Sequence, residues 1–360
     1  MTKIKMKTLT SVHVGSGNAL YEGQDFVIDK SDYVHVIDVN KMGNLIDPRF
    51  VDTWVSMIND GQAIGDIMQR FAPGVPLDQY SKYRIENFAT NVRPREAMKE
   101  VIRDGRGIPY IPGSAIKGAI RTAILATLAA ESADAIKTYN YKTFEEQSFG
   151  GSPNASVFRF LQVGDAFLEG NMSVIATRMG CLNIRKSYDD LHDGKINQLM
   201  EVVRESESAS FEMKLDTSRY LQVKERYQEL TNLPPCMSTL PALFKTINAH
   251  TEKLVKEEID FWTGIDKDGA DQYVDNLKEI LSATASCSEG KSCVLRIGAG
   301  AGWRFTTGAW TEPFSFFEEK VVTQSRRQAN KYLEYPFPKT RRTDGPEDLL
   351  LGFVTLNIIS

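Results

Sequence analysis

The stretch from residue 108 to residue 121, Ile-Pro-Tyr-Ile-Pro-Gly-Ser-Ala-Ile-Lys-Gly-Ala-Ile-Arg, constrains the fold most, because it holds a strand end, a turn and a helix start within a few residues. Pro112 and Gly113 stop extended structure. Ser114 is a good N-cap candidate, and residues 115–130 then continue without proline and with a single glycine. The sequence therefore predicts a helix that begins directly after a strand.

One face of this helix is polar. At about 100° per residue, Ser114, Lys117, Gly118 and Arg121 share that face, while apolar residues spread over the other. Backbone N–H groups at the helix start, two cations and a glycine without a side chain suit a phosphate held close to the backbone. The alternative is an ordinary amphipathic helix whose cations contact only solvent.

The charge of the chain limits which partners it can have. With 360 residues the chain is long enough for two domains, and its net charge of −4 argues against a general nucleic-acid coat. Charge is nevertheless segregated: residues 321–342 are basic, whereas 257–279 are mostly acidic. Any polyanion must therefore bind at local patches.

Composition also argues against several functional classes. The four cysteines lack metal-site spacing, so we expect no metal and no cofactor. No apolar run approaches the roughly 18 residues of a membrane span, and the chain opens without a signal-like segment. We therefore expect a soluble, cytoplasmic protein with no membrane partner.

Two glycine-rich stretches lie far from the first motif. After an alternating first strand, His13 leads into Gly15, Ser16 and Gly17, a turn that could leave N–H groups open to an anion or could be a plain strand-end turn. Near the C-terminus, a short strand opens into Gly298, Gly300 and Gly302, followed by Arg304. Their GxGxG spacing matches neither a dinucleotide loop nor a P-loop, but it invites close approach to the backbone.

Two further segments stand out. Apolar residues recur at helical spacing after Asp47, which predicts a helical insertion over about 41–106. Near the C-terminus, aromatic residues such as Tyr335 and Phe337 interleave with basic ones, the composition that single-stranded RNA binding needs. An exposed loop anchored by buried aromatics is an equal alternative. The basic residues counted as candidate RNA contacts there are Lys339, Arg341 and Arg342.

Together these motifs resemble the RAMP superfamily of CRISPR proteins. The resemblance rests on the His-Val-Gly-Ser-Gly strand end, the Pro-Gly-Ser-x-x-Lys-Gly-x-x-Arg element, a Phe-Gly-Gly-Ser…Val-Gly-Asp-Ala block and the late Gly-Ala-Gly-Ala-Gly-Trp loop. The length, the lead-in at residues 101–105 and the tail at 338–342 look most like the family of fifth Csm subunits of type III-A (Csm) effector complexes. That resemblance implies an α+β fold of tandem ferredoxin-like (RRM-like) domains with glycine-rich loops. We place an N-terminal domain over 1–170, and a C-terminal domain over 171–360 with its loop at 298–308.

The resemblance also implies a function. It implies a ribonucleoprotein subunit for antiviral defense that caps the backbone filament at the 3′ end of the guide crRNA and assists 3′-end maturation without cutting RNA. The implied partners are the crRNA, the crRNA–target duplex, a neighbouring RAMP backbone subunit and the small helical subunit. The residues expected to contact RNA are His13, Gly15, Ser16, Gly17, Gly113, Ser114, Lys117, Gly118, Arg121, Gly298, Gly300, Gly302, Arg304, Lys339, Arg341 and Arg342.

Two other functions stay open. In a metal-independent RAMP endoribonuclease that processes precursor crRNA, His13 would be the acid or base for attack by a 2′-OH. His35, His192 and His250 fall in a predicted strand, a polar loop and a helix stripe, and no motif places a base beside an acid. The second alternative is a protein scaffold that contacts no RNA. We expect a protein without catalytic residues.

Overall fold

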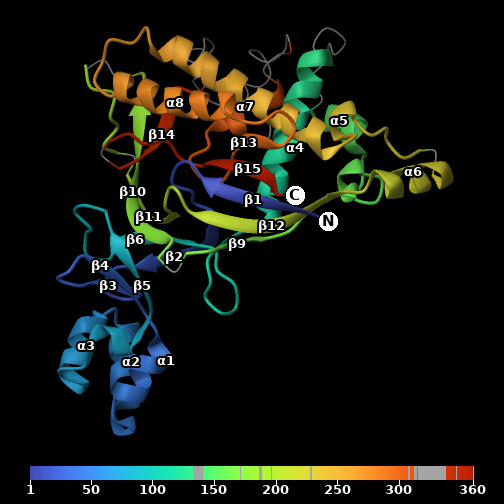
Figure 1. Ribbon diagram of the computed structural model, residues 1–360. Helices are drawn as coiled ribbons and strands as arrows, with labels where there is room; N and C mark the ends of the chain where they lie inside the picture. Colours follow the sequence, from blue (N-terminus) through green and yellow to red (C-terminus); the bar gives the residue numbers. More distant parts are fainter. Residues whose placement is uncertain are drawn as a thin grey trace.

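The computed structural model describes residues 1–132, 141–170, 172–185, 189–195, 197–227, 229–306, 309–311, 314, 338–345 and 347–359. These residues form two β-sheets with helices packed around them (Figure 1). Within these ranges, no helix is both long enough and apolar enough to span a membrane. The predicted aromatic contacts at Tyr335 and Phe337 lie outside the described residues.

The first sheet places strands from both ends of the chain side by side. Its order is β13 (Ser292–Arg296), β15 (Phe353–Ile359), β1 (Thr2–Thr8), β12 (Ser208–Leu215), β9 (Ala166–Leu168) and β7 (Tyr110–Ile111), with β8 (Leu161–Val163) beside β12. In β1, buried Ile4 and Met6 alternate with exposed lysines, which confirms the predicted half-buried strand.

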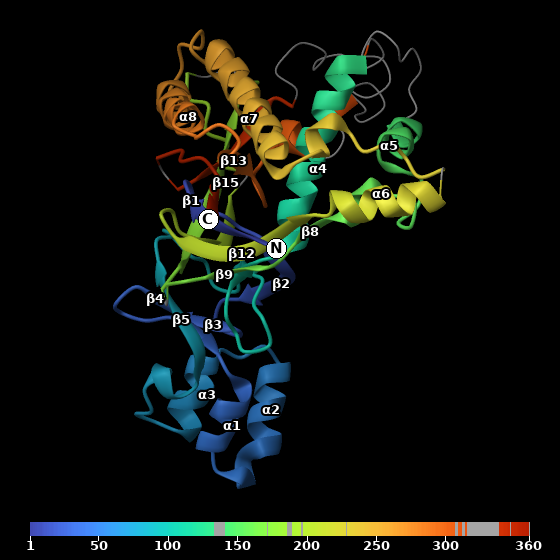
Figure 2. The ribbon, with the colours of Figure 1, turned by 45° about the vertical axis from the view of Figure 1, so that its right-hand side comes forward.

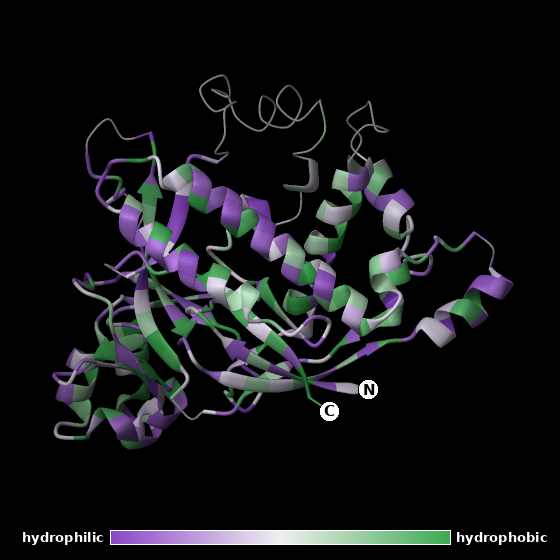
Figure 3. Cartoon of the chain, turned by 45° about the horizontal axis from the view of Figure 1, so that its top comes forward, coloured by the Kyte–Doolittle hydropathy of each residue, from purple (hydrophilic) through white to green (hydrophobic). Residues whose placement is uncertain are grey.

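Long helices cover the buried side of this sheet (Figures 1 and 2). They are α4 (Gly113–Ser132), α7 (Leu240–Trp262) and α8 (Ala270–Ala285), and the shorter α5 (Tyr141–Phe149) and α6 (Thr217–Arg226) lie to one side. Figure 3 shows hydrophilic and hydrophobic segments alternating along α7 and α8, as expected for helices that pack on one side. The long amphipathic helix predicted around residues 243–262 is therefore confirmed.

The second sheet contains the strand that begins with Gly15, Ser16 and Gly17. Its order is β2 (Gly15–Tyr21), β6 (Ala97–Val101), β11 (Gln198–Val203), β10 (Val174–Asn183), β5 (Ser81–Asn87), β4 (Tyr33–Ile37) and β3 (Phe26–Ile28), with β14 (Thr340–Asp344) beside β10. Each sheet contains strands from before and after residue 170. The division into domains 1–170 and 171–360 stays a prediction.

A helical lobe lies next to the β3, β4 and β5 end of the second sheet (Figure 2). It consists of α1 (Val39–Leu45), α2 (Val51–Asn59) and α3 (Ile64–Phe71), packed around a core that includes Met42, Trp54 and Ile67. Short 3-10 turns complete the fold: Pro48–Phe50, Leu77–Gln79, Val157–Phe160, Pro235–Met237, Trp303–Phe305 and Ala309–Thr311.

Three local predictions are wrong. The helical insertion ends at Phe71, because the rest of its predicted span forms β5 and β6. Gly15, Ser16 and Gly17 begin edge strand β2 instead of forming a turn, and a register shift between Gly15 and Ala19 accommodates the positive φ of Gly17 (+91°). The helix that a Ser114 cap predicts to begin at Ala115 begins two residues earlier, at Gly113.

Candidate nucleic-acid interface

The start of α4 is held by the turn after β8. The backbone N–H of Gly113 donates to the Asp165 carboxylate at 2.8 Å, so Asp165 satisfies an amide in the first turn of the helix. A Cβ added to Gly113 would lie only 2.2 Å from the carbonyl oxygen of Val163 and 2.7 Å from that of Gly164. Gly113 therefore serves close packing inside the protein, and the Val-Gly-Asp-Ala block positions the helix start.

The two predicted phosphate-binding cations lie on the expected face and already have partners. The ammonium of Lys117 donates to the carbonyl of Leu161 at 2.6 Å, and burial lowers the pKa of Lys117. Arg121 forms an ion pair with Glu145 and lies 5.6 Å from the ring centre of Phe149. Because an ammonium has three donors and a guanidinium has five, each cation keeps hydrogen-bonding capacity for a phosphate.

Ser114 and Gly118 are the exposed members of the same face. A Cβ added to Gly118 would meet no atom of the protein within 4 Å. Nothing in the fold thus requires glycine there, in contrast to Gly113. This open patch, bordered by Lys117 and Arg121, is called the α4 patch below.

The structure brings the two distant glycine motifs together. The N–H of Ala299 donates to the carbonyl of His13 at 2.8 Å. A Cβ on Gly298 would lie 2.3 Å from that same oxygen, and one on Gly300 would lie 2.6 Å from Leu351. The close approach predicted for the late glycine loop is therefore made, at two of its three glycines, by the protein's own chain. A Cβ added to Gly302 would meet no neighbouring atom within 4 Å.

Backbone hydrogen bonds connect this pair to the segment that leads into α4. Gly15 pairs with Val101 across β2 and β6, and the N–H of Ile102 donates to the carbonyl of Val14 at 2.9 Å. Tyr110 then donates to the carbonyl of Ile102 at 3.4 Å, two residues before the turn into the helix. All three sequence motifs therefore belong to one connected backbone region.

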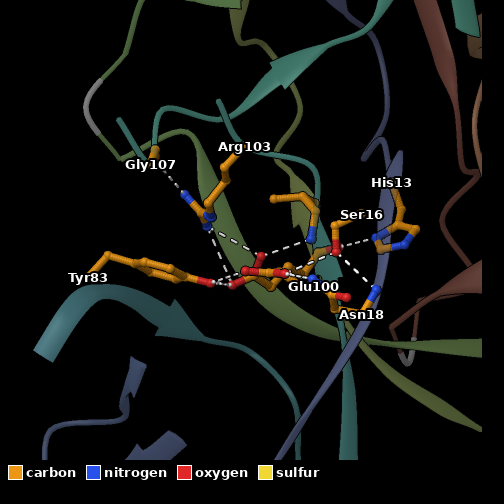
Figure 4. Close-up of polar contacts among 9 residues, drawn as sticks. His13, Ser16, Asn18, Tyr83, Glu100, Arg103 and Gly107 are labelled. Carbon is orange, nitrogen blue, oxygen red and sulfur yellow. Dashed lines mark hydrogen bonds and ion pairs between the residues drawn. The ribbon is translucent and has the colours of Figure 1, made fainter. Parts of the chain in front are cut away.

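A polar cluster around the buried carboxylate of Glu201 adjoins this region, and Figure 4 labels two of its members, Tyr83 and Arg103. Glu201 has no exposed surface, and it accepts hydrogen bonds from the Tyr83 hydroxyl at 2.8 Å and the Val101 N–H at 2.9 Å. Arg103 lies 3.3 Å from it and stacks 3.8 Å from the ring centre of Tyr83. Burial raises the pKa of Glu201, while Arg103 opposes that shift. The cluster ties β5, β6 and β11 together beneath Gly15.

A backbone carbonyl of the same cluster determines which ring nitrogen of His13 carries the hydrogen. Its Nδ1 lies 2.6 Å from the carbonyl oxygen of Glu201, and because a carbonyl only accepts, Nδ1 carries the hydrogen. The ring is 5 % exposed, and burial lowers the pKa of His13. A Cβ on Gly15 would lie 2.9 Å from Nε2. His13 is thus a neutral, enclosed histidine whose second nitrogen is covered by the adjoining strand.

Two arginines predicted to bind RNA are buried, which corrects those predictions. Arg304 is 9 % exposed and pairs with Glu257, and Arg341 is 8 % exposed and binds both carboxylate oxygens of Glu258, at 2.8 and 2.7 Å. A buried guanidinium needs a carboxylate partner, and the sequence separation of these pairs concealed them. Both guanidinium groups therefore pair with carboxylates of α7 inside the protein.

Lys339 and Arg342 belong to the segment around β14. Arg342 is half-buried beside Cys181, its partner across β10, and the backbone carbonyl of Lys339 accepts from Ile184. Arg341 and Arg342 line a cavity of about 20 Å³ together with Gly300 and Gly302. That volume holds about one water, so the tail and the glycine loop meet in packing and leave no space for a ligand.

Several residues that build this region escaped the sequence analysis. Buried Arg296 donates to the carbonyls of Leu351 at 2.9 Å and Gly300 at 3.2 Å, and so fixes the glycine loop. Asp165 was visible within a noted motif, but Arg296 and Glu201 lie in ordinary strand sequence with no local signal. Among the described residues, no group of three or more His, Cys, Asp or Glu side chains is placed to hold a metal ion.

Comparisons with known proteins place this geometry in context. The RAMP superfamily model matches residues 5–306. The CRISPR system Cms protein Csm5 of Streptococcus thermophilus is 28 % identical over 145 residues, which is 35 % of this chain and 38 % of that protein's length. Less than half of that relative is therefore aligned.

Two solved structures resemble the chain over nearly its whole length. One is a chain of the cryo-electron microscopy structure of a Csm–crRNA–target RNA ternary complex in a type III-A CRISPR-Cas system, with a TM-score of 0.70 and 20 % identity. The other is the crystal structure of T. onnurineus Csm5, with a TM-score of 0.65 and 17 % identity. Each alignment covers 99 % of this chain and 100 % of the other. At these identities the likeness establishes the fold.

Proposed function

This chain is a member of the RAMP superfamily with its α+β, ferredoxin-like fold, and from that premise we propose that it is an RNA-binding structural subunit of a type III-A CRISPR effector complex. In this role it caps the backbone filament at the 3′ end of the guide crRNA. The α4 patch is the observation that carries the proposal: Ser114 and Gly118 are exposed, nothing in the protein occupies the space over Gly118, and two cations border it.

The chemistry of the α4 patch suits a sugar-phosphate backbone. A phosphate oxygen can approach the helix where Gly118 lacks a side chain, while Lys117 and Arg121 supply charge from one side. Contacts to phosphates carry no sequence information, and a guide RNA must be held whatever its sequence. The glycine loop and β2 support this surface by fixing the backbone that leads into α4.

The proposed partners are the crRNA, the crRNA–target duplex, a RAMP backbone subunit and the small helical subunit. The acidic segment 257–279 contributes to the end of α7 and to α8, and six of its eight acidic residues are exposed. We assign the chain no cleavage step. His13 is enclosed, and a general base must come within hydrogen-bond reach of the proton it takes. Its contribution to 3′-end maturation is then to cover RNA that other enzymes trim.

A salt series tests the proposal. The assembled complex, or the chain with labelled guide RNA, is titrated between 50 and 200 mM salt, as is a Lys117→Ala, Arg121→Ala double variant. We expect the slope of log affinity against log salt to fall by about 1.4, since single-stranded RNA loses about 0.7 per phosphate contact. A Lys3→Ala, Lys5→Ala variant removes equal charge from exposed positions of β1 and serves as the control. Equal slopes in both variants would refute the α4 patch.

A further inference from the structure

A second basic region is formed by arginines that follow α4 in the sequence, one before β8 and two in α6. A cavity of about 690 Å³ opens between α6 and the segment that precedes β8. Figures 1 and 2 show α6 beside α5, at the edge of the molecule. A volume of this size falls within the range of small-molecule sites.

The walls of the cavity are fixed by packing and hydrogen bonds. Phe160 and Tyr220 meet edge to face with ring centres 5.5 Å apart, which holds α6 against the preceding 3-10 turn. The Tyr220 hydroxyl accepts from the N–H of Leu233 at 3.1 Å and lies 3.3 Å from the carbonyl of Thr231. Asp216 caps the first turn of α6. The site is therefore formed before any ligand arrives.

Three arginines line this cavity, Arg159, Arg219 and Arg226, against one acid, Glu229. All three arginines are exposed. Asp216, at the start of α6, forms its ion pair with Lys214, and the charge of Arg219 adds to the lowering of the Asp216 pKa. One donor of Arg159 binds the carbonyl of Asn154 at 2.6 Å, which fixes that guanidinium in place. Three cations converging on one cavity, in a chain of net charge −4, indicate an anionic ligand.

An aromatic side chain completes the lining. Tyr227 follows the last residue of α6, lines the same cavity and is 68 % exposed. Arginines that bind phosphate next to an aromatic ring that can stack on a base form the usual combination for single-stranded nucleic acid. An inorganic anion or an acidic peptide would make no use of the ring.

We propose that this cavity binds one nucleotide of single-stranded RNA, with the phosphate on Arg159, Arg219 and Arg226 and the base against Tyr227. This inference rests on the proposed RNA-binding function and adds a second contact, which we call the α6 cavity. A strand held at two separate points is fixed in direction as well as in place.

The test uses a uridine decamer that contains 4-thiouridine, irradiated with the full-length chain and followed by peptide mapping. We expect crosslinks within residues 217–230. An Arg219→Ala, Arg226→Ala variant should lose about tenfold in affinity and about 1.4 in salt slope. Changing the same two residues to lysine should restore most of the slope, because the charge returns. The matched control is Arg49→Ala with Arg70→Ala, which removes the same charge from the helical lobe.

The outcomes separate this inference from the proposed function. Crosslinks confined to α4, with an unchanged slope in the Arg219 and Arg226 variant, would overturn the α6 cavity and leave the proposed function standing. Crosslinks at α6 alone would support the cavity and count against the α4 patch. Absence of any RNA binding, in the complex or by the chain alone, would refute both. Displacement of the RNA by polyglutamate as readily as by unlabelled RNA would overturn the nucleotide assignment.

Discussion

Gly298→Ala should destabilise the protein by about 3 kcal/mol, whereas Gly302→Ala should destabilise it by only about 1 kcal/mol. The two glycines have nearly equal φ angles, +76° and +78°. They differ in their surroundings. A Cβ on Gly298 would lie 2.3 Å from the His13 carbonyl oxygen, while one on Gly302 would meet nothing within 4 Å.

The magnitudes follow from that difference. An L-residue held at positive φ costs roughly 1 to 3 kcal/mol, and both variants carry a cost of this kind. At Gly298 the added carbon must also push away the His13 carbonyl, which accepts from the Ala299 N–H at 2.8 Å. Leaving a buried N–H and a buried carbonyl unpaired adds about 1 to 3 kcal/mol. Gly302→Ala is therefore an internal control for backbone strain.

Urea unfolding of the three proteins measures the difference directly. We expect both variants to keep the slope of the wild-type transition and to shift its midpoint, the shift for Gly298→Ala being about three times larger. Equal midpoints for the two variants would show that the glycine loop does not contact His13 as described, and the reasoning that joins the two glycine motifs would fail.

Three further predictions address the α4 patch, the buried carboxylate and a histidine bridge. Gly118→Leu should not lower the unfolding midpoint, because an exposed helix position favours leucine over glycine, but it should weaken assembly on RNA. Unchanged assembly in a pull-down with labelled guide would contradict close approach of a phosphate. Glu201→Ala should cost about 3 to 5 kcal/mol in chemical unfolding because it leaves Arg103 buried without its carboxylate, and a cost under 1 kcal/mol would show that water reaches the cluster. His192 lies 2.5 Å from both Asp190 and Asp348, and these carboxylates raise its pKa against the effect of burial. Its contribution to stability should be complete below the unfolded pKa of about 6.5 and be lost as pH rises through the raised value, so a His192→Gln variant whose stability falls in parallel with wild type over that range would refute the bridge.

Local sequence signals predicted the parts of the fold that local physics determines. The end of extended structure at Pro112, the exposed face with Ser114 and Gly118, and the alternation of β1 all depend on neighbouring residues, and all appear in the structure. The division of the chain into strands after α3 was missed, because 81–101 is too polar to show a clear period.

Long-range pairing accounts for the errors at the site. Arg341 looked like a surface cation because its neighbours are basic, yet its partner Glu258 lies 83 residues away. Glu145 and Leu161 likewise hold the two cations of the α4 patch from outside any motif. The spacing of apolar residues does not indicate which carboxylate pairs with a buried arginine. The burial of a charged side chain is therefore hard to predict from a single sequence.

The central position of β1 has a consequence for synthesis. Lys7 lies beside Thr355 in the first sheet, although 348 residues separate them in the chain. At roughly 5 to 20 residues per second, a ribosome needs about 20 to 70 seconds to make that interval. During this time Ile4 and Met6 of β1 lack their neighbouring strand, β15. The first sheet can therefore be completed only after β15 has been synthesised.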